Sequence, residues 1–345
     1  MTSDVLVQLR GIVKEFPVKS GSLFGSHGDR LQAVAGVSLE LRRGETLGLV
    51  GETGCGKSTL ARCVVRLMDL SAGQVIFDGD DISTASHSQL RPYRRRMQMV
   101  FQDPYGSLNP RRRVGSIIGD PFAIHGIGTA RERRRNVQDL MALVGLNPEH
   151  YNRFPGDFSG GQRQRIGIAR AIALRPEFIV SDEPVSALDV SIQAQILNLL
   201  DELQDELGLT YLFISHDLSV VRHVSDRVAV MYLGKIVEIA PSESLHEHTR
   251  HPYTRALLSA VPAFGPGESR AQAAVILTGD PPSPLDPPHG CRFHPRCPRA
   301  QKRCATEEPQ LEPRCGDGPA HTTACHFPLA DGELLTTRTE AEALP

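Results

Sequence analysis

The chain has 345 residues, of which 40% are hydrophobic and 23% are charged, and its formal net charge is -2. This length predicts a globular protein of about two domains, at ~150 residues per domain. No apolar run approaches the ~18 residues of a membrane span, and the first residues, MTSDVLVQLRG, lack the apolar run of a secretory signal. Because nucleic-acid-binding domains are usually basic, the near-neutral charge also disfavours that class. We therefore expect a cytosolic chain that does not itself cross a membrane.

The N-terminal part reads as strands. VLVQLRGIV (residues 5–13) and GVSLEL (residues 36–41) are predicted to be strands that open the core of the chain. Between Phe16 and Val34 the sequence is rich in glycine and serine, which predicts a loop.

The segment GETGCGKST follows a short apolar run at residues 47–50 and precedes apolar residues at helical spacing. This order predicts strand, loop and helix, and the loop matches the P-loop pattern, in which backbone N–H groups and a helix N-terminus surround phosphate. Lys57 is predicted to meet the β- and γ-phosphates, Ser58 to bind Mg²⁺ and Thr59 to reach the α-phosphate. The flanking strand and helix disfavour an incidental glycine-rich turn. The predicted phosphate-binding residues are Gly51, Glu52, Thr53, Gly54, Cys55, Gly56, Lys57, Ser58 and Thr59.

Residues 81–177 are predicted to form a mostly helical insert. It carries two basic clusters, RPYRRR at residues 91–96 and RERRR at residues 131–135. Such clusters can indicate nucleic acid or anionic lipid, but we interpret them as solvated helix faces because the overall charge is near neutral.

A pair of acids follows an apolar strand in PEFIVSDEPVSALD. Asp182 is predicted to hold the Mg²⁺ shell, and Glu183 is predicted to polarise the attacking water. Phosphoryl transfer needs charge neutralisation and an in-line nucleophile more than covalent chemistry, so two carboxylates at a strand end suit it. A solvated acidic turn is the alternative interpretation.

The next segment, DVSIQAQILNLLDELQDELG, predicts a helix with an apolar stripe. Ile192, Ile196, Leu199 and Leu203 recur at helical spacing, and Gly208 is placed to end the helix. Further along, GKIVE predicts a strand hairpin.

FSGGQRQRIGIARA (residues 158–171) and YLFISHDLSVV (residues 211–221) complete a recognisable order of motifs. With the P-loop and the acid pair, the chain resembles the nucleotide-binding subunits of ABC transporters. The resemblance implies an α/β P-loop NTPase fold with a helical signature subdomain. It also implies that the signature residues contact the γ-phosphate of a nucleotide held by the opposite subunit. These are Ser159, Gly160, Gly161 and Gln162.

The same resemblance assigns four further residues. Gln102, in MVFQDPYGSLNPRR, matches the Q-loop glutamine, which senses the γ-phosphate and Mg²⁺. His216 matches the switch histidine that positions the γ-phosphate, and Asp189 closes the D-loop. Phe16 is the candidate for stacking on adenine, because stacking needs only a π-face, although it could equally be a core residue.

The runs VFQDPYGSLNPR, DEPVSALDVSIQAQILNLL, HPYTRALLSAVP and GDPPSPLDPPHGCRFHPRCP resemble the ATP-binding subunits of oligopeptide and dipeptide importers, and more narrowly their F-type subunit. That resemblance implies an ATPase that forms a heterodimer with a sister ATPase. Its other partners would be two permeases and an extracytoplasmic solute-binding protein, and its location the cytoplasmic face of the membrane. The alternatives are import of another solute (glutathione, a nickel complex or a sugar) and a soluble ABC ATPase acting on nucleic acid or ribosomes.

We expect three regions along the chain. The ATP-binding cassette should cover residues 5–262, and a small Pro/Cys-rich C-terminal extension residues 263–328. Residues 329–345 lack periodic apolar content and are predicted to be a disordered tail.

Five of the seven cysteines fall between Cys291 and Cys325, in a segment poor in apolar residues. In a reducing compartment this clustering favours a metal centre over disulfides. Spacing leaves the metal open: zinc sites usually use closer cysteine pairs, whereas iron–sulfur clusters accept varied spacing. Free thiols are the third interpretation.

The importer resemblance implies a [4Fe-4S] cluster held by Cys291, Cys297, Cys304 and Cys325, with Cys315 left over. A mixed zinc site is the alternative, completed by histidines of the same segment: His289, His294, His321 and His326. Outside this segment, Cys63 is predicted to be a core residue on the helix that follows the P-loop.

Overall fold

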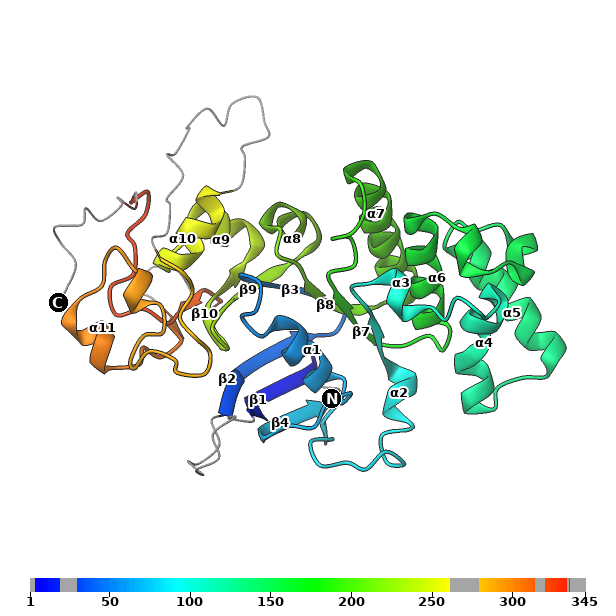
Figure 1. The fold of residues 1–345 in the computed structure, drawn as a ribbon, viewed down its shortest axis with the longest axis horizontal. Helices are drawn as coiled ribbons and strands as arrows, with labels where there is room; N and C mark the ends of the chain where they lie inside the picture. Colours follow the sequence, from blue (N-terminus) through cyan, green and yellow to red (C-terminus); the bar gives the residue numbers. More distant parts are fainter. Residues whose placement is uncertain (1–3, 19–29, 261–278, 314–319, 334, 336–345) are drawn as a thin grey trace.

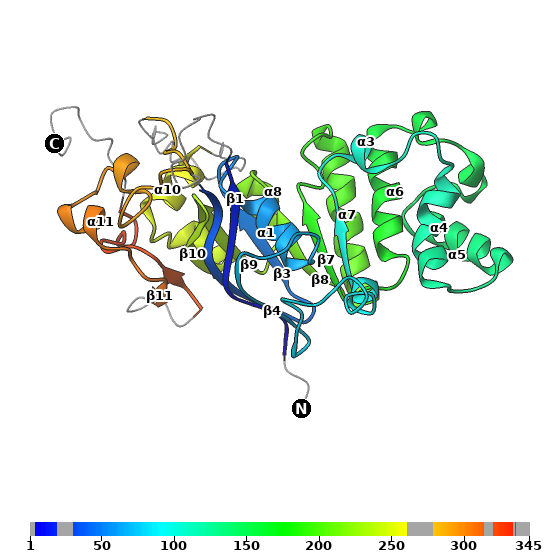
Figure 2. The ribbon, with the colours of Figure 1, turned by 60° about the horizontal axis from the view of Figure 1, so that its bottom comes forward.

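The structure is a computed structural model, and it describes residues 4–18, 30–260, 279–313, 320–333 and 335. Figures 1 and 2 show two sheets near the centre, a group of helices at one end and the C-terminal region at the other. The α/β P-loop fold predicted from the sequence is confirmed.

The first sheet is antiparallel, with strand order β2-β1-β4-β5. It consists of β1 (Val5–Pro17), β2 (Arg30–Arg42), β4 (Ala72–Phe77) and β5 (Asp80–Asp81). The two strands predicted at residues 5–13 and 36–41 are confirmed but are longer. Residues 30–33 were predicted to be loop and are instead strand, because Phe16 pairs with Leu31 and extends the hairpin. Residues 19–29 of that predicted loop lie outside the described residues.

The second sheet has strand order β11-β12-β10-β9-β3-β8-β7-β6. Its members are β3 (Thr46–Val50), β6 (Met97–Val100), β7 (Phe178–Asp182), β8 (Thr210–Ile214), β9 (Arg227–Tyr232), β10 (Lys235–Pro241), β11 (Glu312–Pro313) and β12 (Thr322–Thr323). The run from β9 to β6 is parallel. β3, β7 and β8 are buried at every residue, which is why they read as continuous apolar runs. Their carboxyl ends meet at one edge.

Most of residues 81–177 is helical and lies at one end of the molecule (Figures 1 and 2). The helices are α2 (Tyr93–Arg96), α3 (Pro104–Ser107), α4 (Val114–His125), α5 (Ala130–Leu143) and α6 (Gly160–Ile172), with short turns η1 (Pro148–Asn152) and η2 (Pro155–Asp157). One part of the range differs: β6 is a strand of the main sheet, paired with β7. The insert is therefore interrupted by a core strand.

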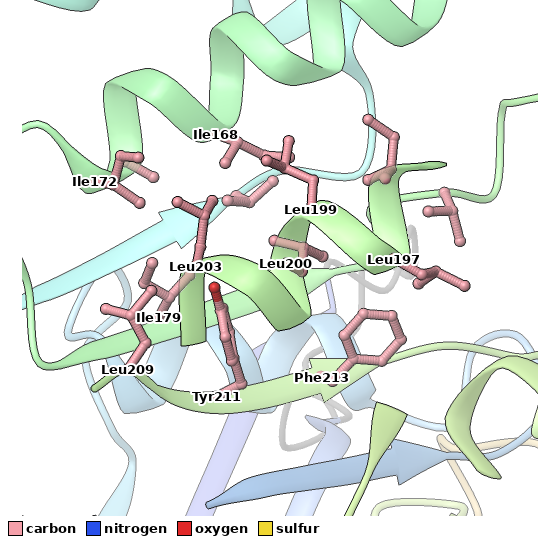
Figure 3. Packing of buried hydrophobic residues seen from close by; sticks show 14 of the residues in the cluster. Ile168, Ile172, Ile179, Leu197, Leu199, Leu200, Leu203, Leu209, Tyr211 and Phe213 are labelled. Atoms are coloured by element: carbon pink, nitrogen blue, oxygen red, sulfur yellow. The ribbon is translucent and has the colours of Figure 1, made fainter. Parts of the chain in front are cut away.

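The helix predicted from the apolar stripe is α7 (Val190–Leu207), and Gly208 ends it with φ 65°. Leu199, Leu200 and Leu203 pack between α6 and β8 (Figure 3). The helix thus joins the helical end to the main sheet. After the P-loop, α1 (Lys57–Val64) is shorter than its apolar spacing predicted, and Leu67 beyond it is 54% exposed. Cys63 is buried, as predicted.

After β8 come α8 (Leu218–Val224), the predicted β9–β10 hairpin, α9 (Ser242–Glu247) and α10 (Pro252–Ser259). Residues 279–290 form no helix or strand, and η3 (His294–Arg296) and α11 (Lys302–Thr306) follow. Residues 329–333 do not fit the prediction of a disordered tail. Leu329 is buried and its N–H donates to the carbonyl of Arg250, so this stretch is packed. Residues 334 and 336–345 lie outside the described residues.

No helix in the described part of the chain is both long and apolar enough to cross a membrane.

Candidate active site

The phosphate loop occupies residues 51–56, between β3 and α1. Gly56, the residue before the helix, has φ 110°, and a Cβ there would lie 2.1 Å from the carbonyl oxygen of Ala33. Only glycine fits this backbone and this approach. The loop is therefore held close to β2, and the first turn of α1 opens directly from it.

The side chain of Lys57 folds back over this loop. Its Nζ donates to the carbonyl oxygens of Gly51, at 2.7 Å, and Glu52, at 3.0 Å. The side chain is buried, so its charge is removed from water, and these carbonyl oxygens compensate for part of the lost hydration. The arrangement places a cation inside the loop whose N–H groups are suited to phosphate.

Ser58 and Asp182 meet at the base of the same loop. Ser58 Oγ donates to Asp182 Oδ1 at 2.9 Å, which joins the first turn of α1 to the end of β7. Burial raises the pKa of the Asp182 carboxyl, and the hydrogen bond from Ser58 opposes that rise. A hydroxyl beside a buried carboxylate is a donor set of the kind that Mg²⁺ prefers, so these residues fit the ion.

Glu183 lies next to this pair and is contacted by two other predicted residues. Gln102 Nε2 donates to Glu183 Oε2 at 2.8 Å, and His216 Nδ1 lies 3.4 Å from the same oxygen. Glu183 has φ 47°, which is uncommon for a residue other than glycine, and its N–H donates to the carbonyl of Ile214. Such strained conformations occur preferentially at functional sites.

The sequence comparisons agree with this geometry. A family model described as "ABC transporter" matches residues 34–186, and one described as "Oligopeptide/dipeptide transporter, C-terminal region" matches residues 237–304. The "Oligopeptide transport ATP-binding protein AppF" of Bacillus subtilis is 53% identical over 325 residues, which are 94% of this chain and 98% of that protein. This chain belongs to the ABC transporter family.

Other relatives extend the comparison. The "Di/tripeptide transport ATP-binding protein DppF" of Pseudomonas aeruginosa is 49% identical and covers 89% of this chain and 94% of its own length. Among solved structures, the ATP-binding cassette MJ0796, described as a dimer in a post-hydrolysis state bound to ADP and Pi, matches with TM-score 0.61 and 27% identity. The matched region covers 69% of this chain and 99% of the MJ0796 chain.

The signature segment of this ABC protein lies apart from its own phosphate loop. Ser159 caps α6, and Gln162 completes a capping box with it, while Gly161 is buried against Ile192. In both views α6, which Gly160 begins, groups with α4 and α5 rather than with α1 (Figures 1 and 2). The chain therefore does not bring these predicted residues to the site formed by its own P-loop.

The remaining predicted contacts are peripheral in the structure. Asp189 is exposed and begins α7, where its carbonyl accepts from the N–H groups of Ile192 and Gln193. Phe16 is half-buried near the end of β1, and Lys14 Nζ lies 5.2 Å from its ring centroid. It does not belong to the buried core.

The other residues of the loop differ in exposure. Thr53 and Gly54 are exposed at its tip, and Thr59 is half-buried in α1. Cys55 points inward and is buried, which raises the pKa of its thiol. Its backbone, rather than its side chain, is the part that faces a ligand of the loop.

Two residues that the sequence did not single out also contact the phosphate loop. Tyr253 OH accepts the N–H of Glu52 at 2.9 Å, and Arg296 donates to the Glu52 carboxylate. Both belong to the part of the chain matched by the C-terminal-region model. No local pattern identifies them, because the contacts join segments about 200 residues apart or more.

The four predicted cluster ligands meet in one place. Cys291, Cys297, Cys304 and Cys325 all line one small pocket. Burial raises the pKa of the Cys291 thiol to about 11 and that of the Cys297 thiol to about 12. Cys315 lies outside the described residues.

Within the described residues, no group of three or more His, Cys, Asp or Glu side chains is placed to hold a metal ion, so this finding supports neither the predicted iron–sulfur cluster nor the zinc alternative. Three of the four candidate histidines have other partners. His294 Nδ1 bonds the carbonyl of Cys291, and His326 Nε2 bonds that of Glu307. His321 Nε2 lies 2.8 Å from the Glu238 carboxylate.

A cavity of about 750 Å³ lies beside Gln102, between the main sheet and the helical end. Its lining combines exposed apolar side chains, Leu67, Phe101 and Ile124, with charged ones such as Arg94. Exposed apolar side chains gathered with charged ones around a hollow are typical of a protein-binding surface.

Proposed function

We propose that this chain is the ATP-hydrolysing subunit of an ABC importer for oligopeptides or dipeptides. One observation carries the proposal: Lys57, the Ser58–Asp182 pair and Glu183 form one site at the carboxyl edge of a parallel sheet. The relatives are named as oligopeptide and di/tripeptide transport ATP-binding proteins, and they align over almost the whole chain.

In this proposal the phosphate loop binds ATP. Lys57 would neutralise the β- and γ-phosphates, the backbone of residues 51–56 would surround them, and Thr59 would reach the α-phosphate. Ser58, Gln102 and Asp182 would hold Mg²⁺, which supplies charge neutralisation when bound. Adenine would stack on Phe16.

Glu183 would act as the general base. Its Oε2 would accept a proton from the water that attacks the γ-phosphate, and Gln102 and His216 would fix the orientation of the carboxylate through their contacts with that oxygen. Since Gln102, Glu183 and His216 follow three separate strands, β6, β7 and β8, the base would be held by the sheet rather than by one loop.

The second half of the site would come from another subunit. Ser159 caps α6, and α6 lies apart from α1, the helix that follows the phosphate loop (Figure 1). This separation supports the binding of Ser159 and Gly161 to a nucleotide held by the opposite subunit, with Asp189 near that interface. We infer a heterodimer with a sister ATPase. Each nucleotide would then be bound between two chains.

The cavity beside Gln102 would receive a cytoplasmic loop of a permease. A partner docked there would contact the residue that bonds Glu183, which couples the membrane subunit to hydrolysis. We infer two permeases and an extracytoplasmic solute-binding protein as further partners, and a peripheral location on the cytoplasmic face.

The cysteine pocket would hold a [4Fe-4S] cluster. Each iron of such a cluster is bound by its own thiolate, so four cysteines surround a pocket rather than converge on one ion. The gathering of Cys291, Cys297, Cys304 and Cys325 around one pocket supports this. Binding would require loss of the thiol protons, and burial, which raises the pKa of Cys291 and of Cys297, opposes that loss at these two residues.

Reconstitution tests the function. The complex of this chain with its co-expressed partners, placed in vesicles, should accumulate labelled tripeptides in an ATP-dependent manner, and Lys57→Ala should abolish uptake. Hydrolysis stimulated by glutathione, a nickel complex or a sugar, but not by peptides, would show that this solute, and not a peptide, is the cargo. Hydrolysis stimulated by RNA or ribosomes would favour the soluble ATPase.

The metal is tested separately. The chain, purified without oxygen, should contain about four iron and four sulfide per polypeptide, and Cys297→Ser should lower both. One zinc without iron, or no metal at all, would contradict the cluster.

A further inference from the structure

The cysteine-rich region contacts the phosphate loop through one ion pair. Arg296, at the end of η3 and directly before Cys297, donates from Nη1 to Glu52 Oε2 at 2.9 Å and from Nη2 to Glu52 Oε1 at 3.2 Å. The Arg296 side chain is only 8% exposed and that of Glu52 26%. A two-point guanidinium–carboxylate pair that is mostly removed from water is both directional and strong.

All three polar groups of Glu52 are engaged. Its N–H donates to Tyr253 OH, its carbonyl accepts from Lys57 Nζ, and its carboxylate accepts from Arg296. Two of these partners come from the C-terminal part of the chain and the third is the lysine of the phosphate loop. The position of Glu52 is thus set jointly by the C-terminal region and the lysine.

Two partners of Glu52 join a buried aromatic cluster: Tyr253 belongs to it, and Arg296 contacts Tyr232. The ring centroids of Tyr232 and Tyr253 are 4.6 Å apart, and that of Phe293 lies 5.2 Å from the first and 5.4 Å from the second. All three side chains are fully buried. Phe293 also lines the cysteine pocket, so the packing is continuous from that pocket to the phosphate loop.

We propose that Arg296 is a positioning residue that holds the phosphate loop in its ATP-binding geometry through Glu52, so that the cysteine-rich region sets the nucleotide affinity of this subunit. The inference rests on the proposed function, because it needs ATP to bind at this loop. Loss of the guanidinium frees the Glu52 carboxylate, and the backbone on which phosphate binding depends loses one of its fixed points.

A different role would be purely structural: the ion pair could only fasten the C-terminal region to the cassette. The two roles differ in measurable ways. A fastening role lowers the melting temperature of the chain and leaves ATP affinity unchanged, whereas a positioning role weakens ATP binding in a chain that remains folded.

The experiment measures MgATP affinity of the full chain by titration calorimetry, together with its melting temperature. Arg296→Met should weaken MgATP binding by about tenfold, which corresponds to about 1.4 kcal/mol. Arg296→Lys, which keeps the charge but not the two-point geometry, should have an MgATP affinity between those of the wild type and Arg296→Met. The matched control is Arg303→Met, since Arg303 lies in the same region and pairs with the exposed Glu307. It should bind MgATP as the wild type does.

A second variant guards against misfolding. If Arg296→Met does not fold, Glu52→Gln tests the same pair from the other side, and the exchanged pair Glu52→Arg with Arg296→Glu should regain part of the affinity that each single change loses. In the assembled importer, the KM for ATP should rise with little change in kcat. Wild-type affinity in folded Arg296→Met or Glu52→Gln would overturn the inference, while a wild-type chain that binds no MgATP would overturn the proposed function itself.

Discussion

Gln102 Nε2 donates to Glu183 Oε2 at 2.8 Å, across a sequence separation of 81 residues. The same carboxylate oxygen is contacted by His216. The proposed general base, Glu183, is therefore hydrogen-bonded to a residue that lines the proposed permease cavity, so a partner that moves Gln102 would also move Glu183. In the proposed importer, Oε2 of Glu183 would be the atom through which a movement of the permease reaches the site of hydrolysis.

The first prediction concerns this carboxylate. Glu183→Gln keeps the shape of the side chain but removes the proton acceptor, so ATP hydrolysis should fall by about 10²-fold or more. MgATP binding should persist, because Lys57 and the loop are untouched. Phosphate release and MgATP titration on the same preparation measure the two effects. Unchanged turnover would contradict the role of Glu183.

The second prediction concerns Asp182. Burial raises its pKa, so the protonated carboxyl group stabilises the folded chain. This stabilisation is lost as pH rises through the folded-state pKa. Asp182→Asn, which stays neutral, should raise the melting temperature of the metal-free chain at neutral pH. It should also abolish the further rise that MgATP causes in the wild type. A variant that MgATP still stabilises fully would show that Asp182 does not hold the ion.

The third prediction concerns the start of α6. A Cβ at Gly161 would lie 2.5 Å from Cγ2 of Ile192, a branched side chain at the start of α7. Gly161→Ala should therefore lower the free energy of unfolding by about 1–3 kcal/mol. Ile192→Ala makes room for the added methyl, so the double variant should lose less than the two single losses added together. Denaturant titration of the four proteins measures the coupling, and strict additivity would contradict the clash.

The fourth prediction concerns the attachment of the C-terminal strand. The buried Glu238 carboxylate accepts from the N–H groups of Arg250 and His251 and meets His321 Nε2. Glu238→Ala leaves these buried donors without an acceptor and should cost about 3–5 kcal/mol of unfolding free energy.

The matched control for that change is Glu308→Ala. Glu308 pairs with Lys235 but is half exposed, so its removal should cost less than about 1 kcal/mol. Equal losses for the two variants would contradict the assigned importance of the buried carboxylate.

Local signals predicted the elements of the site well. The strand, loop and helix around Lys57, the acids after β7 and the α7 helix are each encoded within a continuous stretch of sequence. Their convergence followed from the parallel sheet, which brings strand ends together. Gln102 and His216 were singled out only through the family resemblance, because a single glutamine or histidine carries no pattern of its own. Their contacts with Glu183 were not predicted.

Other features had no local signal. The pair between Arg296 and Glu52 joins residues 244 positions apart, and neither stands in a periodic pattern. Strand β6 was hidden in the predicted helical insert because four residues are too few to show a period. The packed stretch at residues 329–333 was missed since its order depends on Leu329 being buried against a distant part of the chain.

The pairing of β12 with β10 has a consequence for how this protein can be divided. One edge of β10 pairs with β9. Without β12, the other edge would present unpaired backbone groups, and Thr322 and Thr323 pair with two of its residues. Uncovered edges of this kind recruit other chains and promote aggregation. A fragment that ends at residue 304, where the match to the C-terminal-region model ends, would lack β12. Its β10 edge would be unpaired and would promote aggregation.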